Sequence, residues 1–128
     1  MPYLRVLSYR IITATLQTPP FDFANHIYVK PVPNVGDGNS VAEAQMTHIL
    51  SIPAGAQGYV NGTPPSLVPT VYALNGQFEV HRHILQTERP VYFAWDVVAG
   101  TTHPPIISSF SLGTGAERPG EGPFDTSP

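Results

Sequence analysis

The stretch Gly76–Asp96, GQFEVHRHILQTERPVYFAWD, decides how the chain is read, because it holds the single tryptophan and two of the five histidines. Its apolar residues recur at every second position, and successive side chains of an extended strand point to opposite faces. We therefore predict a strand after the Asn75-Gly76 turn, with one face in the core and the other in solvent. The core face holds Phe78 and Val80, and the solvent face holds Glu79, His81 and His83.

The same period of two runs through most of the chain and predicts further strands. Strands are expected over residues 3–16, 26–32, 44–52, 70–74, 77–85, 90–98 and 106–112, separated by breaks rich in proline and glycine. Strands at this spacing without helical crossovers are typical of an all-β fold, here an antiparallel β-sandwich of about eight strands.

This sandwich is predicted to occupy residues 1–113 as a single domain, followed by a Gly/Pro-rich C-terminal tail at residues 114–128. Its core is expected to draw on the large apolar residues of the inward-facing positions. These are Val6, Ile27, Val29, Leu50, Ile52, Phe78, Val80, Val91, Phe93 and Trp95.

The composition excludes several classes of function. The net charge is −3, and six lysines and arginines cannot build the basic surface that nucleic acid requires. The absence of cysteine excludes disulfides and cysteine metal sites. No signal-like pattern opens the sequence and no apolar run approaches membrane-spanning length. We therefore expect a cytoplasmic or peripheral membrane protein without a transmembrane segment.

His81 and His83 raise the question of a metal site. Two histidines on one strand face can chelate zinc, iron or copper, with Glu79 or Glu88 as a carboxylate ligand. Such a site needs further ligands, for which His26, His48 and His103 are the candidates. The other interpretation is that these residues form the solvent face of a half-buried strand and bind no cofactor. We favour this second interpretation, and a histidine-bound transition metal stays an open alternative.

Several short motifs are similar to those of C2 domains, the calcium- and lipid-binding β-sandwiches. The run LRVLSYRIITATL, a loop containing Asp22 and the segment NHIYVKP resemble the opening of that family. Tyr28, Val29 and Lys30 match the end of its Asp-Pro-Tyr-Val-Lys run.

Later motifs extend the resemblance over most of the chain. VPTVYALNGQFEV is similar to the family's Asn-Pro-x-Trp/Phe-Asn-Glu-x-Phe-x-Phe stretch, and RPVYFAWDVVAG resembles the strand that enters its Val-x-Asp-x-Asp loop. The matching residues are Pro69, Tyr72, Phe78 and Val80 in the first motif, and Phe93, Trp95 and Asp96 in the second.

The resemblance implies binding of calcium or lipid through loops at one end, but the calcium ligands are incomplete. Calcium takes about six to eight oxygen ligands, whereas these loops offer only Asp22 and Asp96. Val98 stands at the second aspartate position of the last loop, and His103 lies where further carboxylates belong. A member with these loops is calcium-independent or binds calcium weakly.

The function we favour from the sequence is a non-catalytic, C2-like binding module that recognises a protein or membrane surface. The loops TPPFDFAN and DVVAGTTHPP would carry the contacts. Two alternatives stay open: a self-assembling structural or carbohydrate-binding β-sandwich (a lectin, or a capsid or filament subunit), and a small metal-dependent enzyme that uses His81 and His83. The expected ligand-binding residues are Phe21, Asp22, Phe23, Asn25, Lys30, Asp96 and His103.

Overall fold

The computed structural model describes residues 2–14, 24–49, 52, 58–100, 103–114, 117–118 and 122–123. Within these ranges, seven strands form one sheet in the order β1-β2-β3-β5-β4-β7-β6, which closes into a barrel because β6 pairs with β1. The strands are β1 (Tyr3–Ala14), β2 (Ala24–Pro31), β3 (Ala44–Ile49), β4 (Gly58–Asn61), β5 (Val68–Leu74), β6 (Tyr92–Val97) and β7 (Ile106–Gly113).

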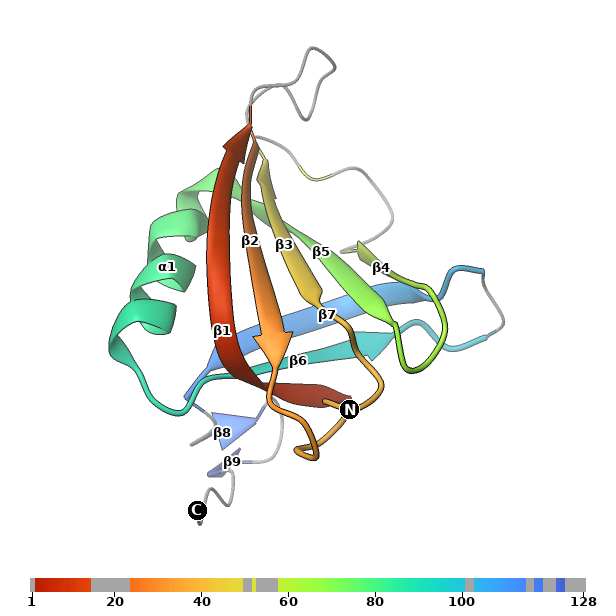
Figure 1. Ribbon diagram of the computed structural model, residues 1–128. Coiled ribbons are helices and arrows are strands. Elements are labelled where there is room, and N and C mark those ends of the chain that lie inside the picture. The colour runs from red at the N-terminus through yellow and green to blue at the C-terminus, as the bar shows by residue number, and fades with distance from the viewer. Residues whose placement is uncertain are drawn as a thin grey trace.

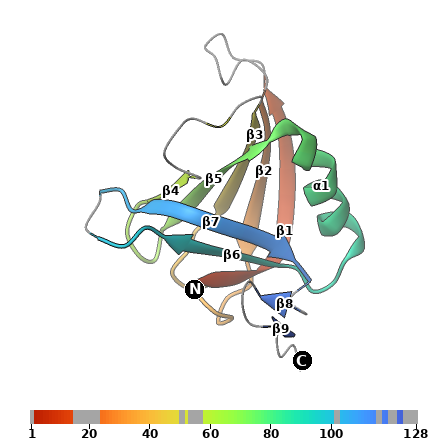
Figure 2. The ribbon, with the colours of Figure 1, turned by 180° about the vertical axis from the view of Figure 1, so that it is seen from behind.

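The predicted sandwich of about eight antiparallel strands is therefore wrong, although most of the predicted strands are present. Figure 1 shows β1, β2, β3 and β5 side by side with β6 and β7 crossing behind them, and Figure 2 shows the crossing pair from the other side. The barrel is also not wholly antiparallel, since β3 and β5 pair in parallel. The intervening β4, which falls in a break between the predicted strands, pairs with the other edge of β5.

A bulge in β1 allows the sheet to close. Val6 pairs with Pro31 and Ser8 with Lys30, so Leu7 is an extra residue in β1, and its side chain is 64% exposed. Before the bulge, Tyr3, Leu4 and Arg5 pair with β6; beyond it the strand pairs with β2 alone. A bulge bends its strand and increases the local twist. Strand β1 can thus pair with β6 through its first residues and with β2 through the rest of its length.

The predicted strand at residues 77–85 is wrong as well. A short helix η1 (Asn75–Gln77) follows β5 and leads into the α-helix α1 (Phe78–Thr87), which lies at one end of the barrel. The helical period turns Phe78, His81 and Leu85 to one face, and His81 and Leu85 are buried. Glu79 and Arg82, three residues apart on the outer side, form an ion pair.

The core is otherwise close to expectation. Among the predicted residues, Ile27, Val29, Val91, Phe93 and Trp95 are buried, and Val6 and Phe78 pack against them in part. Ile52 is half-buried, and Leu50 lies outside the described residues. Val80 is the exception: it is 52% exposed, because it faces outward from a helix and not inward from a strand.

The segment 114–128, expected as a tail, contributes the two-stranded sheet of β8 (Glu117–Arg118) and β9 (Gly122–Pro123). No helix within the described ranges has the length and apolar character needed to span a membrane.

Candidate functional site

Two buried histidines from different elements meet inside the fold. His48, on β3, is fully buried, and His81, on α1, is 8% exposed. His48 Nε2 lies 2.8 Å from His81 Nδ1, a hydrogen-bonding distance. The strand supplies one ring because His48 follows Met46 on the inward-facing side of β3, and the helix supplies the other because His81 lies on its buried face.

The proton positions on the two rings follow from the backbone oxygen of Asn25. This oxygen lies 3.1 Å from His48 Nδ1 and can only accept a hydrogen bond, so Nδ1 of His48 carries a proton. In a neutral ring Nε2 of His48 is then an acceptor, and His81 Nδ1 donates to it. The remaining nitrogen, Nε2 of His81, keeps its lone pair and has no hydrogen-bond partner among the described residues.

Burial keeps both rings neutral at pH 7. Desolvation and the neighbouring His81 lower the pKa of His48 to about 4, against an opposing contribution from the hydrogen bond to Asn25. Burial also lowers the pKa of His81 below its ordinary value. The pair therefore offers an uncharged proton acceptor and not a cation.

Aromatic rings hold the pair in place on both sides. The ring of Phe78 meets His48 edge-on, with centroids 5.3 Å apart, and the ring of Phe110 meets His81 in the same manner at 6.0 Å. Phe110 in turn stacks on Phe93, a core residue. The imidazole orientations are thus fixed by packing as well as by hydrogen bonds.

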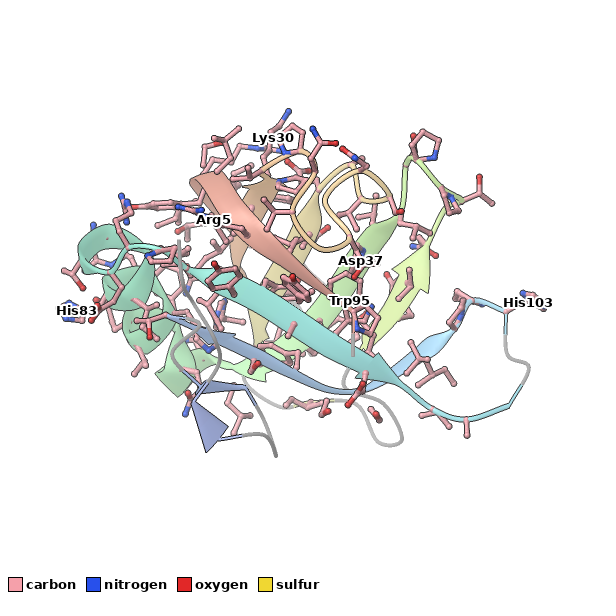
Figure 3. The ribbon with its side chains drawn as sticks, turned by 90° about the horizontal axis from the view of Figure 1, so that it is seen from below. Arg5, Lys30, Asp37, His83, Trp95 and His103 are labelled. Carbon is pink, nitrogen blue, oxygen red and sulfur yellow. The ribbon has the colours of Figure 1, made fainter. Side chains whose placement is uncertain are left out.

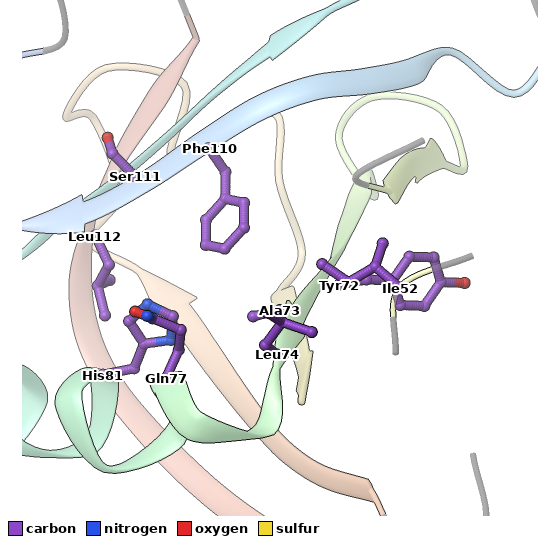
Figure 4. Close-up of a pocket in the computed structure, with 9 residues that line it drawn as sticks. All are labelled: Ile52, Tyr72, Ala73, Leu74, Gln77, His81, Phe110, Ser111 and Leu112. Carbon is purple, nitrogen blue, oxygen red and sulfur yellow. The ribbon is translucent and has the colours of Figure 1, made fainter. Parts of the chain in front are cut away.

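His81 also lines an open pocket of about 290 Å³. Figure 4 shows His81 and Gln77 on the side of the helix, residues of β7 along a second side, and residues of β5 with Ile52 across from the helix. Most of the lining is apolar. The lining residues are Ile52, Tyr72, Ala73, Leu74, Gln77, His81, Phe110, Ser111 and Leu112.

Tyr72 is the second titratable side chain in this lining. Burial, together with the hydrogen bond with Tyr59, raises the pKa of its phenol to about 12. The two rings lie 6.2 Å apart between centroids on the paired strands β5 and β4. The Tyr72 phenol is therefore uncharged at any physiological pH and is already engaged with Tyr59.

The structure separates the residues of the metal site that the sequence left as an alternative. His81 and His83 are two positions apart on a helix, and such residues do not face each other. His83 is exposed on the outer side of α1 (Figure 3), and Glu79 pairs with Arg82. No group of three or more potential metal-ligating side chains occurs in the described part of the chain.

The predicted loop site is also distributed over the molecule. Lys30 is exposed on β2 and His103 is exposed between β6 and β7, far from α1 in Figure 3. Asp96 lies near the end of β6, where its carbonyl accepts a hydrogen bond from Ser108. Asn25 contributes its backbone oxygen to His48. Phe21, Asp22 and Phe23 lie outside the described residues.

The strand register places the two predicted loops at different ends. β6 runs antiparallel to the first residues of β1, so β6 ends near the start of β1, and the connection to β7 leaves from there. The connection from β1 to β2 leaves from the other end of β1, after Ala14. The described strand ends therefore do not bring these loops to a shared surface.

Comparisons with protein-family models, with curated proteins and with solved structures found no match for this chain.

Sequence reasoning missed the pocket and the pairing of its two histidines. The sequence indicated His48 only as a further candidate metal ligand, and Tyr72 only as a residue of a motif similar to that of C2 domains. One signal for His48 was present: it follows Met46 on the apolar face of a predicted strand, where a polar ring needs an internal partner. The signal for His81 was its spacing from Phe78 and Leu85, which fits a buried helix face.

Proposed function

We propose that this protein is a small-molecule-binding barrel, in which the neutral histidine pair anchors the polar end of a largely apolar ligand. The observation that carries the proposal is that Nε2 of His81, a residue lining a largely apolar pocket, has no hydrogen-bond partner within the described part of the chain. A buried polar atom without a partner is costly, by about 1–3 kcal/mol. A ligand that hydrogen-bonds to this nitrogen relieves that cost and gains binding free energy from it.

The form of the pocket supports a ligand with a small apolar body. Its volume of about 290 Å³ lies at the lower end for ligand sites, which span about 300–1,000 Å³. The rings and aliphatic chains of Phe110, Leu112 and Ile52 offer apolar contact area. We therefore expect ligands with one ring or a short branched chain and one polar group.

The proposal is binding and not catalysis, because the lining offers one proton acceptor without a matched acid. General acid–base catalysis works best with groups whose pKa lies near the operating pH. Tyr72, the other titratable residue in the described lining, has a pKa of about 12. His81 alone can orient a ligand, but the pair of groups needed for proton transfer to and from a substrate is missing from the described lining.

Fragment screening by protein-observed ¹H–¹⁵N NMR tests the proposal. We expect hits with a dissociation constant of roughly 1 mM or tighter, given about 0.5 kcal/mol per heavy atom for an eight-atom ligand. Their shift changes should centre on the backbone amides of α1, β5 and β7. A screen without hits, or with hits confined to other surfaces, would contradict the proposal.

Two variants of β7 provide a matched control for the screen. Leu112→Trp enlarges a side chain that lines the pocket from the same face of β7 as Phe110, and it should abolish fragment binding. Ser109→Trp adds the same ring to an exposed position of the same strand and should leave binding unchanged. Equal binding by both variants would show that the fragments occupy a different site.

A further inference from the structure

The hydrogen-bonding direction of His81 is fixed by its contact with His48. The amide of Gln77, by contrast, can donate or accept and adapts to either kind of ligand, and the phenol of Tyr72 is engaged with Tyr59. His81 Nδ1 is committed to His48, and the two nitrogens of an imidazole point in divergent directions. Whether His81 presents a hydrogen-bond donor or an acceptor to the pocket is therefore set by His48 and not by the ligand.

Reversing that direction would cost one of the two hydrogen bonds that fix the pair. If His81 carried its proton on Nε2, its Nδ1 would be an acceptor, and His48 would have to donate from Nε2. Neutral His48 would then present a bare Nδ1 to the carbonyl oxygen of Asn25 at 3.1 Å, so two lone pairs would face each other. His48 is fully buried, so water cannot relieve this contact. The hydrogen bonds therefore keep Nε2 of His81, a residue that lines the pocket, as an acceptor.

The same site disfavours anions. The described lining contains neither lysine nor arginine. A carboxylate or phenolate would place its charge against the lone pair of His81 in an apolar surrounding, where an unpaired charge is strongly destabilised. Protonating His81 to compensate is opposed by the burial that lowers its pKa.

We infer that the pocket selects neutral ligands that donate a hydrogen bond, with phenols and other weakly acidic hydroxyl compounds as the chemical class. This inference rests on the small-molecule binding proposed above. The ligand hydroxyl donates to His81 Nε2, its apolar body lies against β7, and no proton is transferred.

Isothermal titration calorimetry with three matched probes tests the selection. The probes are 4-methylphenol, its methyl ether 4-methylanisole, and 4-methylbenzoate, which share a toluene body and differ in the polar group. We expect the phenol to bind the wild-type protein about tenfold more tightly than the ether, since the ether leaves His81 Nε2 unpaired. The benzoate should bind more weakly than the ether.

The variant His81→Phe keeps a ring at the position but removes the acceptor. We expect it to bind the phenol and the ether with equal affinity. His83→Ala, which removes an exposed imidazole from the same helix, should keep the wild-type preference. If His81→Phe does not fold, imidazole ¹⁵N NMR of the wild-type protein replaces it: the phenol should shift the His81 Nε2 resonance, and the ether should not.

The outcomes separate the inference from the proposed function. Binding of all three probes to wild-type protein with equal affinity, blocked by Leu112→Trp, would overturn the inference while the binding function stood. A preference for the ether or the benzoate, or a phenol preference that survives in His81→Phe, would also overturn it. No binding by any probe, together with a fragment screen without hits, would remove the proposed function and the inference with it.

Discussion

His81 Nδ1 donates a hydrogen bond to His48 Nε2 across 2.8 Å, and this contact joins helix α1 to strand β3. Both rings are buried, and each takes its orientation from a second neighbour: Asn25 for His48 and Phe110 for His81. The contact has two consequences. It makes the stability of the fold depend on the protonation of two imidazoles, and it sets the chemistry of the pocket that His81 lines.

The stability of the protein should fall as the pH decreases from about 6.5 to about 4. The pKa of His48 is lowered to about 4 in the folded protein, so in this range the unfolded chain binds a proton that the folded protein does not. Stability therefore rises with pH through this window and levels off above it. His48 alone accounts for about 3 kcal/mol at 1.36 kcal/mol per pH unit, and the lowered pKa of His81 and His26 acts in the same direction.

Urea unfolding at pH 7.0 and pH 5.0 measures this effect. The variant His83→Ala, which lacks an exposed imidazole, is the control and should show the same loss as wild type. A free energy of unfolding that is equal at the two pH values would show that the histidine pair is not buried and neutral.

Gly58 should be essential for closing the barrel. Its φ is +153°, and a Cβ added there would collide with the backbone carbonyl oxygen of Thr70 on the paired strand β5. β4 is the link between β5 and β7, so pushing it away opens the sheet. We expect Gly58→Ala to lower the free energy of unfolding by at least about 2 kcal/mol.

Gly76→Ala is the matched control, because a Cβ at Gly76 meets no atom within 4 Å. This variant should be as stable as wild type or slightly more stable, since alanine loses less backbone entropy than glycine on folding. Equal thermal melting curves for Gly58→Ala, Gly76→Ala and wild type would contradict the described pairing of β4 with β5.

The helical assignment of residues 78–87 predicts opposite outcomes for two nearby apolar residues. Val80 is 52% exposed on α1, so Val80→Lys should change the free energy of unfolding by less than about 0.5 kcal/mol. Leu85 is 1% exposed, so Leu85→Ala should cost about 2–5 kcal/mol. Chemical denaturation of both variants checks this. A large loss for Val80→Lys would instead favour a strand in which Val80 faces the core.

Trp95 should report the integrity of the barrel. It is 3% exposed, belongs to the core cluster, and lies 5.7 Å from Phe93 between ring centroids. Trp95→Ala should cost about 3–5 kcal/mol, the usual loss for truncating a buried aromatic residue. In the wild-type protein we expect blue-shifted tryptophan fluorescence that external quenchers reach poorly. Emission at the wavelength of the unfolded protein would contradict this burial.

Alternation of apolar residues was sufficient to predict most strands and the burial of Trp95, because period-two patterns describe half-buried strands directly. It could not distinguish a sandwich from a barrel. Closure depends on the extra residue Leu7 in β1, and a bulge is invisible in a pattern that simply continues on both sides of it. The parallel pairing of β3 with β5 is a long-range choice that local sequence does not encode.

The candidate site was harder to predict because residues 77–85 satisfy two patterns. Read with a period of two, Phe78 and Val80 face the core; read with a helical period, Phe78, His81 and Leu85 do. The second reading buries His81, and only then can His48 reach it. Each histidine belongs to a different element, so the pair exists only in the tertiary structure.

The protonation state of His81 is the central claim and can be measured directly by long-range ¹H–¹⁵N NMR of the imidazole rings at pH 7. Loss of signals in His83→Ala and His103→Ala identifies the exposed rings, which simplifies assignment of the buried pair. We predict a protonated Nδ1 and an unprotonated Nε2 on both His81 and His48. A protonated Nε2 on His81, or two protonated nitrogens on either ring, would contradict the account.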